Sequence, residues 1–224
     1  MMKPVFGRIC LGIEIAALVA GVAGCQGTYY KAMEKLGKHK RDILVDRVEN
    51  ARDAQQSAKE QFQTALERFS AVVKVPTGEL ESKYNQLRTE LERSEDKAGA
   101  VSSRIAAVED VAKALFQEWQ SELDQYTNKD LRRSSERRLK ETQVRYQQLI
   151  GAMKQAERKI APVLAAFRDQ VLFIKHNLNA QAIASLQDEL VSIESNVASL
   201  IKEMDASIAE ANTFIKAMVK SNGA

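Results

Sequence analysis

The chain has 224 residues, of which 33 are basic and 30 acidic, so its net charge is only +3 at neutral pH. This balance argues against a strongly basic nucleic-acid-binding protein, and no nucleic-acid partner is expected. Ten glycines and three prolines, in a chain rich in good helix formers, are typical of long helices rather than sheets. Cys10 and Cys25 are the only cysteines, which excludes a disulfide framework or a thiolate metal site in the remaining chain.

Residues 1–24 have the composition of a secretory signal peptide. Lys3 and Arg8 precede an apolar stretch from Ile9 to Gly24, and Glu14 lies inside that stretch. A carboxylate near the centre of a bilayer costs about 2.5–3.5 kcal/mol, and the stretch is short for a spanning helix. The pattern therefore favours a transient signal over a permanent transmembrane anchor.

The signal ends in Val22-Ala23-Gly24-Cys25, which resembles the lipobox of bacterial lipoproteins. The resemblance implies removal of residues 1–24 and lipidation of the Cys25 thiol, so that acyl chains hold the protein on a membrane. The alternative is an ordinary signal peptide, or an uncleaved helix, that happens to end in cysteine. The expected location is the bacterial cell envelope, facing the periplasm. Gln26 after the cysteine favours the outer over the inner membrane, by analogy with enteric lipoproteins.

Three breaks divide the rest of the chain, which we expect to form a single extended helical domain over residues 25–224. The breaks are Val75-Pro76-Thr77-Gly78, the stretch around Thr127 with Asp130 three residues later, and His176-Asn177-Leu178-Asn179. They predict four helices of roughly 40–48 residues, or about 60–70 Å each. The expected ranges are 29–74, 79–126, 130–176 and 180–220.

Between the breaks, apolar residues recur with a 4-3 alternation that is typical of coiled-coil packing. The seams run from Leu44 to Val72, Leu80 to Trp119, Leu139 to Phe167, and Ile183 to Met218. Helices of matched length joined by short turns predict an all-α fold, an elongated antiparallel up-down-up-down bundle.

Two features leave alternatives open. Pro162 lies inside the third helix and should kink or divide it. Apolar residues at Ile174, Leu178, Ala182 and Leu186 keep i, i+4 spacing across the third break. A continuous helix there would give three helices, the last one very long, instead of four. The seam can also be satisfied between chains, which leaves a homo-oligomer open.

The sequence offers little chemistry for catalysis. His39 and His176 stand alone, and neither belongs to a Glu-x-x-His pair of the di-iron type. No phosphate-binding loop, nucleophile elbow or His-x-x-x-His pair is present. Carboxylates alternate with Lys and Arg at helical spacing, as on solvated faces. We therefore expect no enzyme activity, no metal and no cofactor.

Two basic clusters lie near the predicted starts of the first and third helices. An up-down-up-down bundle brings these starts together with the end of the fourth helix and its Lys216 and Lys220, at the membrane-proximal end. We expect the clusters to contact anionic lipid head groups; the alternative is a solubilising surface neutralised by local Arg–Glu pairs. The cluster residues are Lys31, Lys35, Lys38, Lys40, Arg41, Arg132, Arg133, Arg137, Arg138 and Lys140.

Two stretches near the opposite end are apolar on all sides, Val72 to Pro76 and Val171 to Asn179. Such stretches are either packed by neighbouring helices or offered to a partner. Core packing is the commoner explanation, but an exposed tip would provide a protein contact. The expected contact residues are Phe173, Ile174, Lys175, His176 and Asn177, with Arg168 and Asp169 at the rim.

Three stretches carry a resemblance to a family: "EKLGKHKRDILVDRVENARDAQQSAKEQF", "LRRSSERRL" and "DQVLFIKHNLNAQAIASL". Together they resemble a family of uncharacterised proteobacterial coiled-coil lipoproteins, defined only as a domain of unknown function. The resemblance covers nearly the whole chain after Cys25 and implies an envelope location and a helical, coiled-coil-rich fold. It brings no catalytic residues.

The expected function is that of a lipid-anchored structural or adaptor module, which holds a contact surface for an envelope protein away from the membrane. The alternative is a membrane-active or lipid-handling helical protein that exposes its seams to a bilayer or to acyl chains. A tightly filled core favours the first function, whereas a continuous apolar groove favours the second.

Overall fold

The computed structural model describes residues 30, 33, 37–74, 80–177 and 180–220. The chain divides into two compact units, Met1–Lys40 and Arg41–Ala224. The described part of the second unit holds four long α-helices, the first of which begins one residue before the boundary, and one short 3₁₀ helix. Their bounds are α2 Lys40–Lys74, α3 Leu80–Glu122, η1 Leu123–Gln125, α4 Lys129–His176 and α5 Ala180–Lys220.

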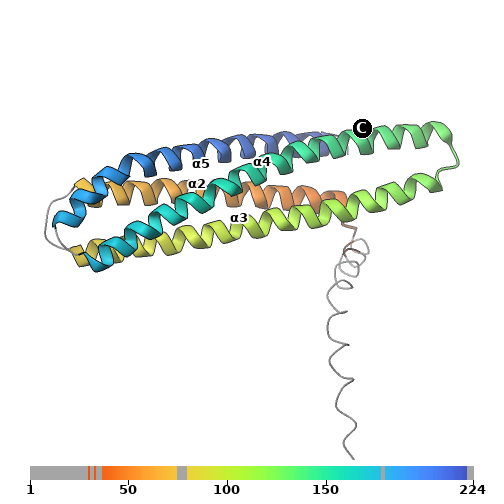
Figure 1. Cartoon of the computed structure of the whole chain (residues 1–224). Coiled ribbons are helices and arrows are strands. Elements are labelled where there is room, and N and C mark those ends of the chain that lie inside the picture. The colour runs from red at the N-terminus through yellow and green to blue at the C-terminus, as the bar shows by residue number, and fades with distance from the viewer. Residues whose placement is uncertain (1–29, 31–32, 34–36, 75–79, 178–179, 221–224) are drawn as a thin grey trace, which may run out of the picture. The chain divides into compact units, whose positions relative to one another are not determined.

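The four helices of the second unit lie side by side along a common axis (Figure 1). Helices α2 and α3 run in opposite directions. Ser57 of α2 is bonded to Lys97 of α3, whereas Gln61, four residues later in α2, is bonded to Glu90, seven residues earlier in α3. The same reversal relates α3 to α4, where Glu95 pairs with Arg168 and Glu109 with Lys154. It also relates α2 to α5, where Arg52 bonds to Asn212 and Lys59 to Asp205. The predicted all-α antiparallel bundle of four helices is therefore confirmed.

The predicted seams form the core. Every seam residue from Leu44 to Val72 and from Leu139 to Phe167 is buried, including the polar Gln55 and Thr142. On α3 and α5 the described seam positions are buried as well, except Tyr84, Trp119 and Leu190, which are half-buried. Phe69 and Phe167 meet across the core from α2 and α4, with ring centroids 6.4 Å apart. Periodic apolar spacing thus predicted which face of each helix turns inward.

The third break separates two helices, so the three-helix alternative is wrong. Helix α4 ends at His176, and the backbone of Asn177 leaves the helical conformation with φ −132° and ψ 60°. The Asn177 backbone N–H donates to the Ile174 carbonyl at 3.2 Å, and its side-chain amide donates to the Phe173 carbonyl at 3.0 Å. Helix α5 then packs along α4.

Pro162 does not divide α4, which is continuous from Lys129 to His176. Its ring lies on the exposed face of the helix. The carbonyl of Arg158, which loses its i+4 amide donor, is therefore on the side where water can replace that donor.

The predicted start of the first helix at residue 29 needs correction. Gly37 has φ +79°, a left-handed conformation that an L side chain rarely adopts, and helix α2 begins only at Lys40. A continuous helix from 29 to 74 is therefore interrupted before α2. The break at 75–78 lies outside the described residues, although α2 and α3 end and begin at its two sides.

The second break also differs in detail from the prediction. The cap of α4 is Asn128 rather than Thr127, because the Asn128 Oδ1 accepts from the backbone N–H groups of Asp130 at 2.9 Å and Leu131 at 3.2 Å. Helix α3 ends at Glu122, and η1 replaces the predicted last turn.

The buried Tyr146 on α4 should make the stability of the folded chain depend on pH. Its ring packs edge-on against Phe116, with the two ring centroids 5.4 Å apart. Burial raises the pKa of the Tyr146 phenol from 10.0 to about 12, and the negative charge of Glu109 adds to this effect. Because the folded state favours the neutral phenol, stability is fully present below pH 10 and falls as the pH rises through 12. Tyr146→Phe should flatten this decline in urea titrations made across that window, whereas the same change at the exposed Tyr126 should leave it unchanged.

Candidate functional site

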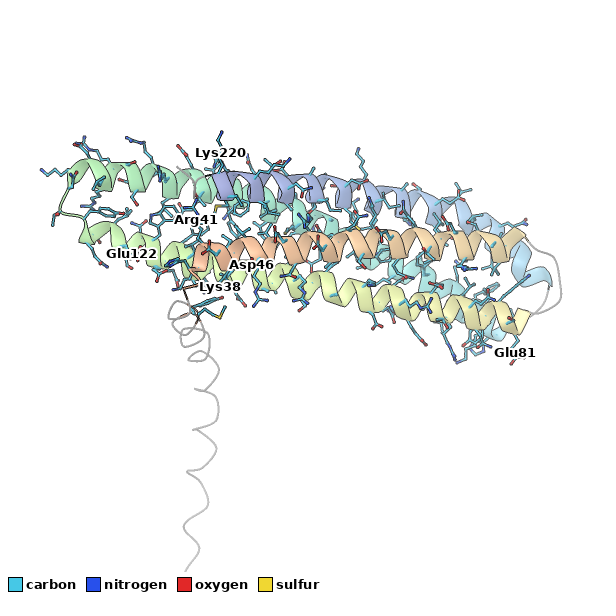
Figure 2. All side chains as sticks on the ribbon, turned by 180° about the vertical axis from the view of Figure 1, so that it is seen from behind. Lys38, Arg41, Asp46, Glu81, Glu122 and Lys220 are labelled. Atoms are coloured by element: carbon cyan, nitrogen blue, oxygen red, sulfur yellow. The ribbon has the colours of Figure 1, made fainter. Side chains whose placement is uncertain are left out.

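The start of α2, the start of α4 and the end of α5 lie at one end of the bundle, as predicted, but this end is stepped. Figure 2 shows that the α3–α4 connection extends further along the axis than Arg41 and Lys220. Arg138 lines a cavity together with Lys220 at the end of α5, and it lies nine helical positions after Lys129. The step is therefore about 14 Å at 1.5 Å per residue. We refer to residues 120–137 as the hairpin tip.

The hairpin tip has its own small set of internal contacts. Leu123 in η1 is buried, and the indole N–H of Trp119, at the base of the tip, donates to the Ser135 hydroxyl at 2.8 Å. Tyr126 and Leu131 are exposed at the connection, with 41% and 58% of their surfaces accessible. These contacts join α3 to α4 in the part of the hairpin that extends past the start of α2 and the end of α5.

Three of the predicted lipid-contact residues are paired with nearby carboxylates. Arg132 bonds to Asp124 at 2.9 Å, Arg133 to Asp130 at 3.0 Å and Lys140 to Glu136 at 2.8 Å. The hydrogen bond from Lys140 is the main reason that the pKa of Glu136 lies below its usual value. These side chains are exposed, so the pairs add little stability but neutralise charge locally.

Arg137 and Arg138 differ from these three. Arg137 and Arg138 make no ion pair with any residue in the described part of the chain, and the same holds for Arg145 two turns further along α4. Lys38 and Lys40 belong to the first unit, where the Lys40 ammonium lies 5.7 Å from the centre of the Tyr30 ring. The predicted residues Cys25, Lys31 and Lys35 lie outside the described residues.

A cavity of about 350 Å³ lies at the inner corner of the step. It forms because α5 ends while α3 and α4 continue, which leaves part of their inner faces uncovered. All four long helices contribute to its walls. The lining residues are Arg41, Trp119, Arg138, Glu141, Thr142, Arg145, Ala217, Met218 and Lys220.

Arg41 ties the start of α2 to the end of α5 inside this cavity. Its Nη2 donates to the Met218 carbonyl at 3.2 Å, while its Nε is buried and has no hydrogen-bond partner. Burial lowers the pKa of Arg41, the positive charge of Arg138 lowers it further, and Asp42 partly opposes both effects. The guanidinium is therefore held next to another cation in partly dehydrated surroundings.

Sequence reasoning missed Arg145 and did not treat Trp119 as part of a site. A signal for one wall was available: Arg138, Thr142 and Arg145 are spaced i, i+4, i+7, which places them on one helix face. Nothing in the sequence connects this face to Arg41 or Lys220, because those residues arrive from other helices.

The predicted partner contact at the opposite end is only partly available. Ile174 is buried with 3% of its surface accessible and packs in the core beside Val171, so it cannot be a contact residue. Phe173 is 38% exposed and Leu172 48% exposed, and Lys175 and His176 are exposed with them. Val72 and Val73 are buried, so core packing is the correct explanation for the described part of that apolar stretch.

None of the helices in the described part of the chain contains an apolar stretch of the length that a membrane crossing requires. Within the same residues, His, Cys, Asp and Glu side chains do not gather in groups of three or more that could hold a metal ion.

Comparison with known proteins gives a family but no activity. No curated protein matches the sequence. One family model matches residues 29–218, a range that covers all four helices nearly to the end of α5. The chain therefore belongs to the family described as "Protein of unknown function (DUF2959)".

Proposed function

We propose that this protein is a lipid-anchored structural or adaptor module of the bacterial cell envelope, which acts without catalysis. Cys25 would be the anchor, and the bundle would act as a rigid spacer that carries a protein-contact surface. The observation that carries the proposal is a long four-helix core whose seam residues are buried over the length of the bundle. Such a core resists bending because close-packed side chains interlock between helices.

The interior of the bundle favours a spacer over a lipid-handling protein. Away from the cavity at the step, the space inside the bundle between Phe69, Leu87 and Phe167 has a volume of only about 10 Å³. That is about the space of one water molecule, whereas sites for drug-sized ligands take hundreds of Å³. An acyl chain would enter this seam only if the helices separated.

The anchoring part of the proposal predicts a different result for each of the two cysteines. Cys25→Ser should abolish incorporation of labelled fatty acid and release the protein from the membrane fraction, because only this thiol follows a lipobox-like sequence. Cys10→Ser is the matched control and should change neither result. Unchanged labelling of Cys25→Ser, or equal loss in both variants, would contradict lipidation at Cys25.

The spacer part predicts different neighbours at the two ends of the bundle. A photoreactive residue at Phe173 should give a protein adduct in the native envelope, and one at Arg137 should give a lipid adduct. Val191, 71% exposed on α5, provides a control position. Lipid adducts at both Phe173 and Arg137 would favour the membrane-active alternative.

A further inference from the structure

We propose that the cavity lined by Arg41, Arg138 and Arg145 is a binding site for a phosphate group. The cavity lies at the inner corner of the step, where α5 ends beside the α3–α4 hairpin. Its lining includes four cations, the three arginines and Lys220, against one carboxylate, Glu141, which gives a net lining charge of +3 (4 − 1). Guanidinium groups bind phosphate with paired, charge-assisted hydrogen bonds, so this lining is suited to such an anion.

The hydrogen bonds of Arg41 leave donors of its guanidinium group unused among the described residues. Its buried Nε has no partner, although buried polar groups in proteins are generally satisfied. Among the nitrogens of Arg41, Nη2 is the one that donates to the Met218 carbonyl, and Glu141 in the same cavity forms no ion pair with Arg41. The Nε has no accessible surface, so a phosphate oxygen in the cavity would accept from the terminal guanidinium nitrogens, of which only Nη2 has a partner among the described residues.

Helix capping explains only part of the arrangement. A cation next to the last carbonyls of α5 is favourable because it opposes the negative end of the helix dipole, which accounts for Arg41 and Lys220. It does not account for Arg138 and Arg145, which reach the cavity from α4 and have no carboxylate partner among the described residues. Like charges gathered in this way repel, and a bound anion would remove the repulsion.

The remaining walls indicate what can accompany the phosphate. Trp119, Ala217 and Met218 form an apolar side next to the cationic one. A phospholipid head group with the first atoms of its glycerol fits this combination, and so does free phosphate held by the cations alone. A phospholipid as the source of the phosphate group rests on the proposed membrane role of the protein. The phosphate site itself does not depend on that role.

Trp119 allows the site to be tested directly, because it is the only tryptophan of the chain and lines the cavity. The purified full chain is titrated with inorganic phosphate, and separately with vesicles of phosphatidylglycerol or phosphatidylcholine, while Trp119 emission is recorded. The pocket variant is Arg138→Gln with Arg145→Gln. The matched control, Arg158→Gln with Arg168→Gln, removes two exposed arginines of the same helix that neither line the cavity nor belong to the basic clusters.

We expect a saturable change in emission whose Kd rises about tenfold or more in the pocket variant, because charge-assisted hydrogen bonds are lost. The control variant should bind as the parent does. A response to inorganic phosphate with this pattern identifies free phosphate as a sufficient ligand. A response to phosphatidylglycerol vesicles alone, with the same pattern, identifies the lipid head group.

Two results would overturn the site: no response to either probe, or equal weakening in both variants, which would mean only general attraction to a basic surface. Thermal unfolding of each variant checks that the bundle is intact. The titrations use purified protein and are independent of the fatty-acid labelling of Cys25 in cells. If the titrations show no binding while Cys25 is labelled, the phosphate site is rejected and the anchor proposal stands. Loss of the anchor proposal leaves the phosphate titration unaffected.

Discussion

Phe62→Ala is expected to lower the free energy of unfolding by about 3–5 kcal/mol, the range for deleting a fully buried aromatic ring. Phe62 has no accessible surface and lies on α2 between two links to neighbouring helices. Lys59 pairs with Asp205 of α5 on one side, and Gln61 bonds to Glu90 of α3 on the other. The wall of the resulting cavity is therefore held from two directions and cannot easily collapse.

Urea unfolding followed by circular dichroism measures this loss as a shift of the midpoint. The matched control is Phe173→Ala, which deletes the same ring at a position that is 38% exposed. It should cost about 1 kcal/mol or less, in line with substitutions away from a core. Equal losses in the two variants would mean that Phe62 is not part of a closed core.

The second large effect concerns a buried polar pair, for which two substitutions should act in opposite directions. Gln55 and Ser207 both lie in the seams with no accessible surface, and the Ser207 hydroxyl donates to the Gln55 Oε1 at 2.7 Å. The Gln55 Nε2 is buried without any partner. A buried donor that makes no hydrogen bond costs about 1–3 kcal/mol.

Gln55→Leu should therefore raise the free energy of unfolding by about 1 kcal/mol, because it removes the unpaired donor and keeps a similar volume. The Ser207 hydroxyl loses its acceptor in this variant, but it can turn to donate to the backbone carbonyl four residues earlier in its own helix. Ser207→Ala should lower it by about 1–3 kcal/mol, because it leaves the Gln55 carbonyl oxygen unpaired as well. The double variant, Gln55→Leu with Ser207→Ala, should unfold later than the parent chain. A double-mutant cycle from urea unfolding gives the coupling energy.

Destabilisation by Gln55→Leu would contradict this account and would indicate that the amide has a partner in solution, such as an ordered water. Gln56→Leu provides a control one residue away, where the side chain points outward and bonds to Glu60 within its own helix. That change should leave stability within about 0.5 kcal/mol of the parent.

The core was predictable because it depends on a local property. Side chains four and three residues apart fall on one face of a helix, so the spacing from Leu44 to Val72 was enough to select the buried face of α2. This held even for Gln55, whose polarity argues against burial but whose position in the seam does not. The helix ends were less predictable. Thr127 and Asn128 are adjacent and both residue types are good N-caps, so the sequence does not show at which of them the helix begins.

The composition of the candidate site was not predictable in the same way. Arg138 was recognised in a basic cluster, but Arg145 and Trp119 became part of a site only where α5 ends opposite them. Ile174 shows the reverse case, because its place in an apolar stretch suggested a contact surface and the neighbouring helices bury it.

Periodicity along the chain was therefore sufficient for the helices, their buried faces and their antiparallel order, because each of these follows from the repeat of a single helix and from short connections. The offset of one helix against another is set by the summed packing of several faces, and no single helix carries that information. This offset makes the hairpin tip extend beyond α2 and α5. It also brings Arg41 from the start of the bundle, and Lys220 from its end, to the cavity beside Arg145.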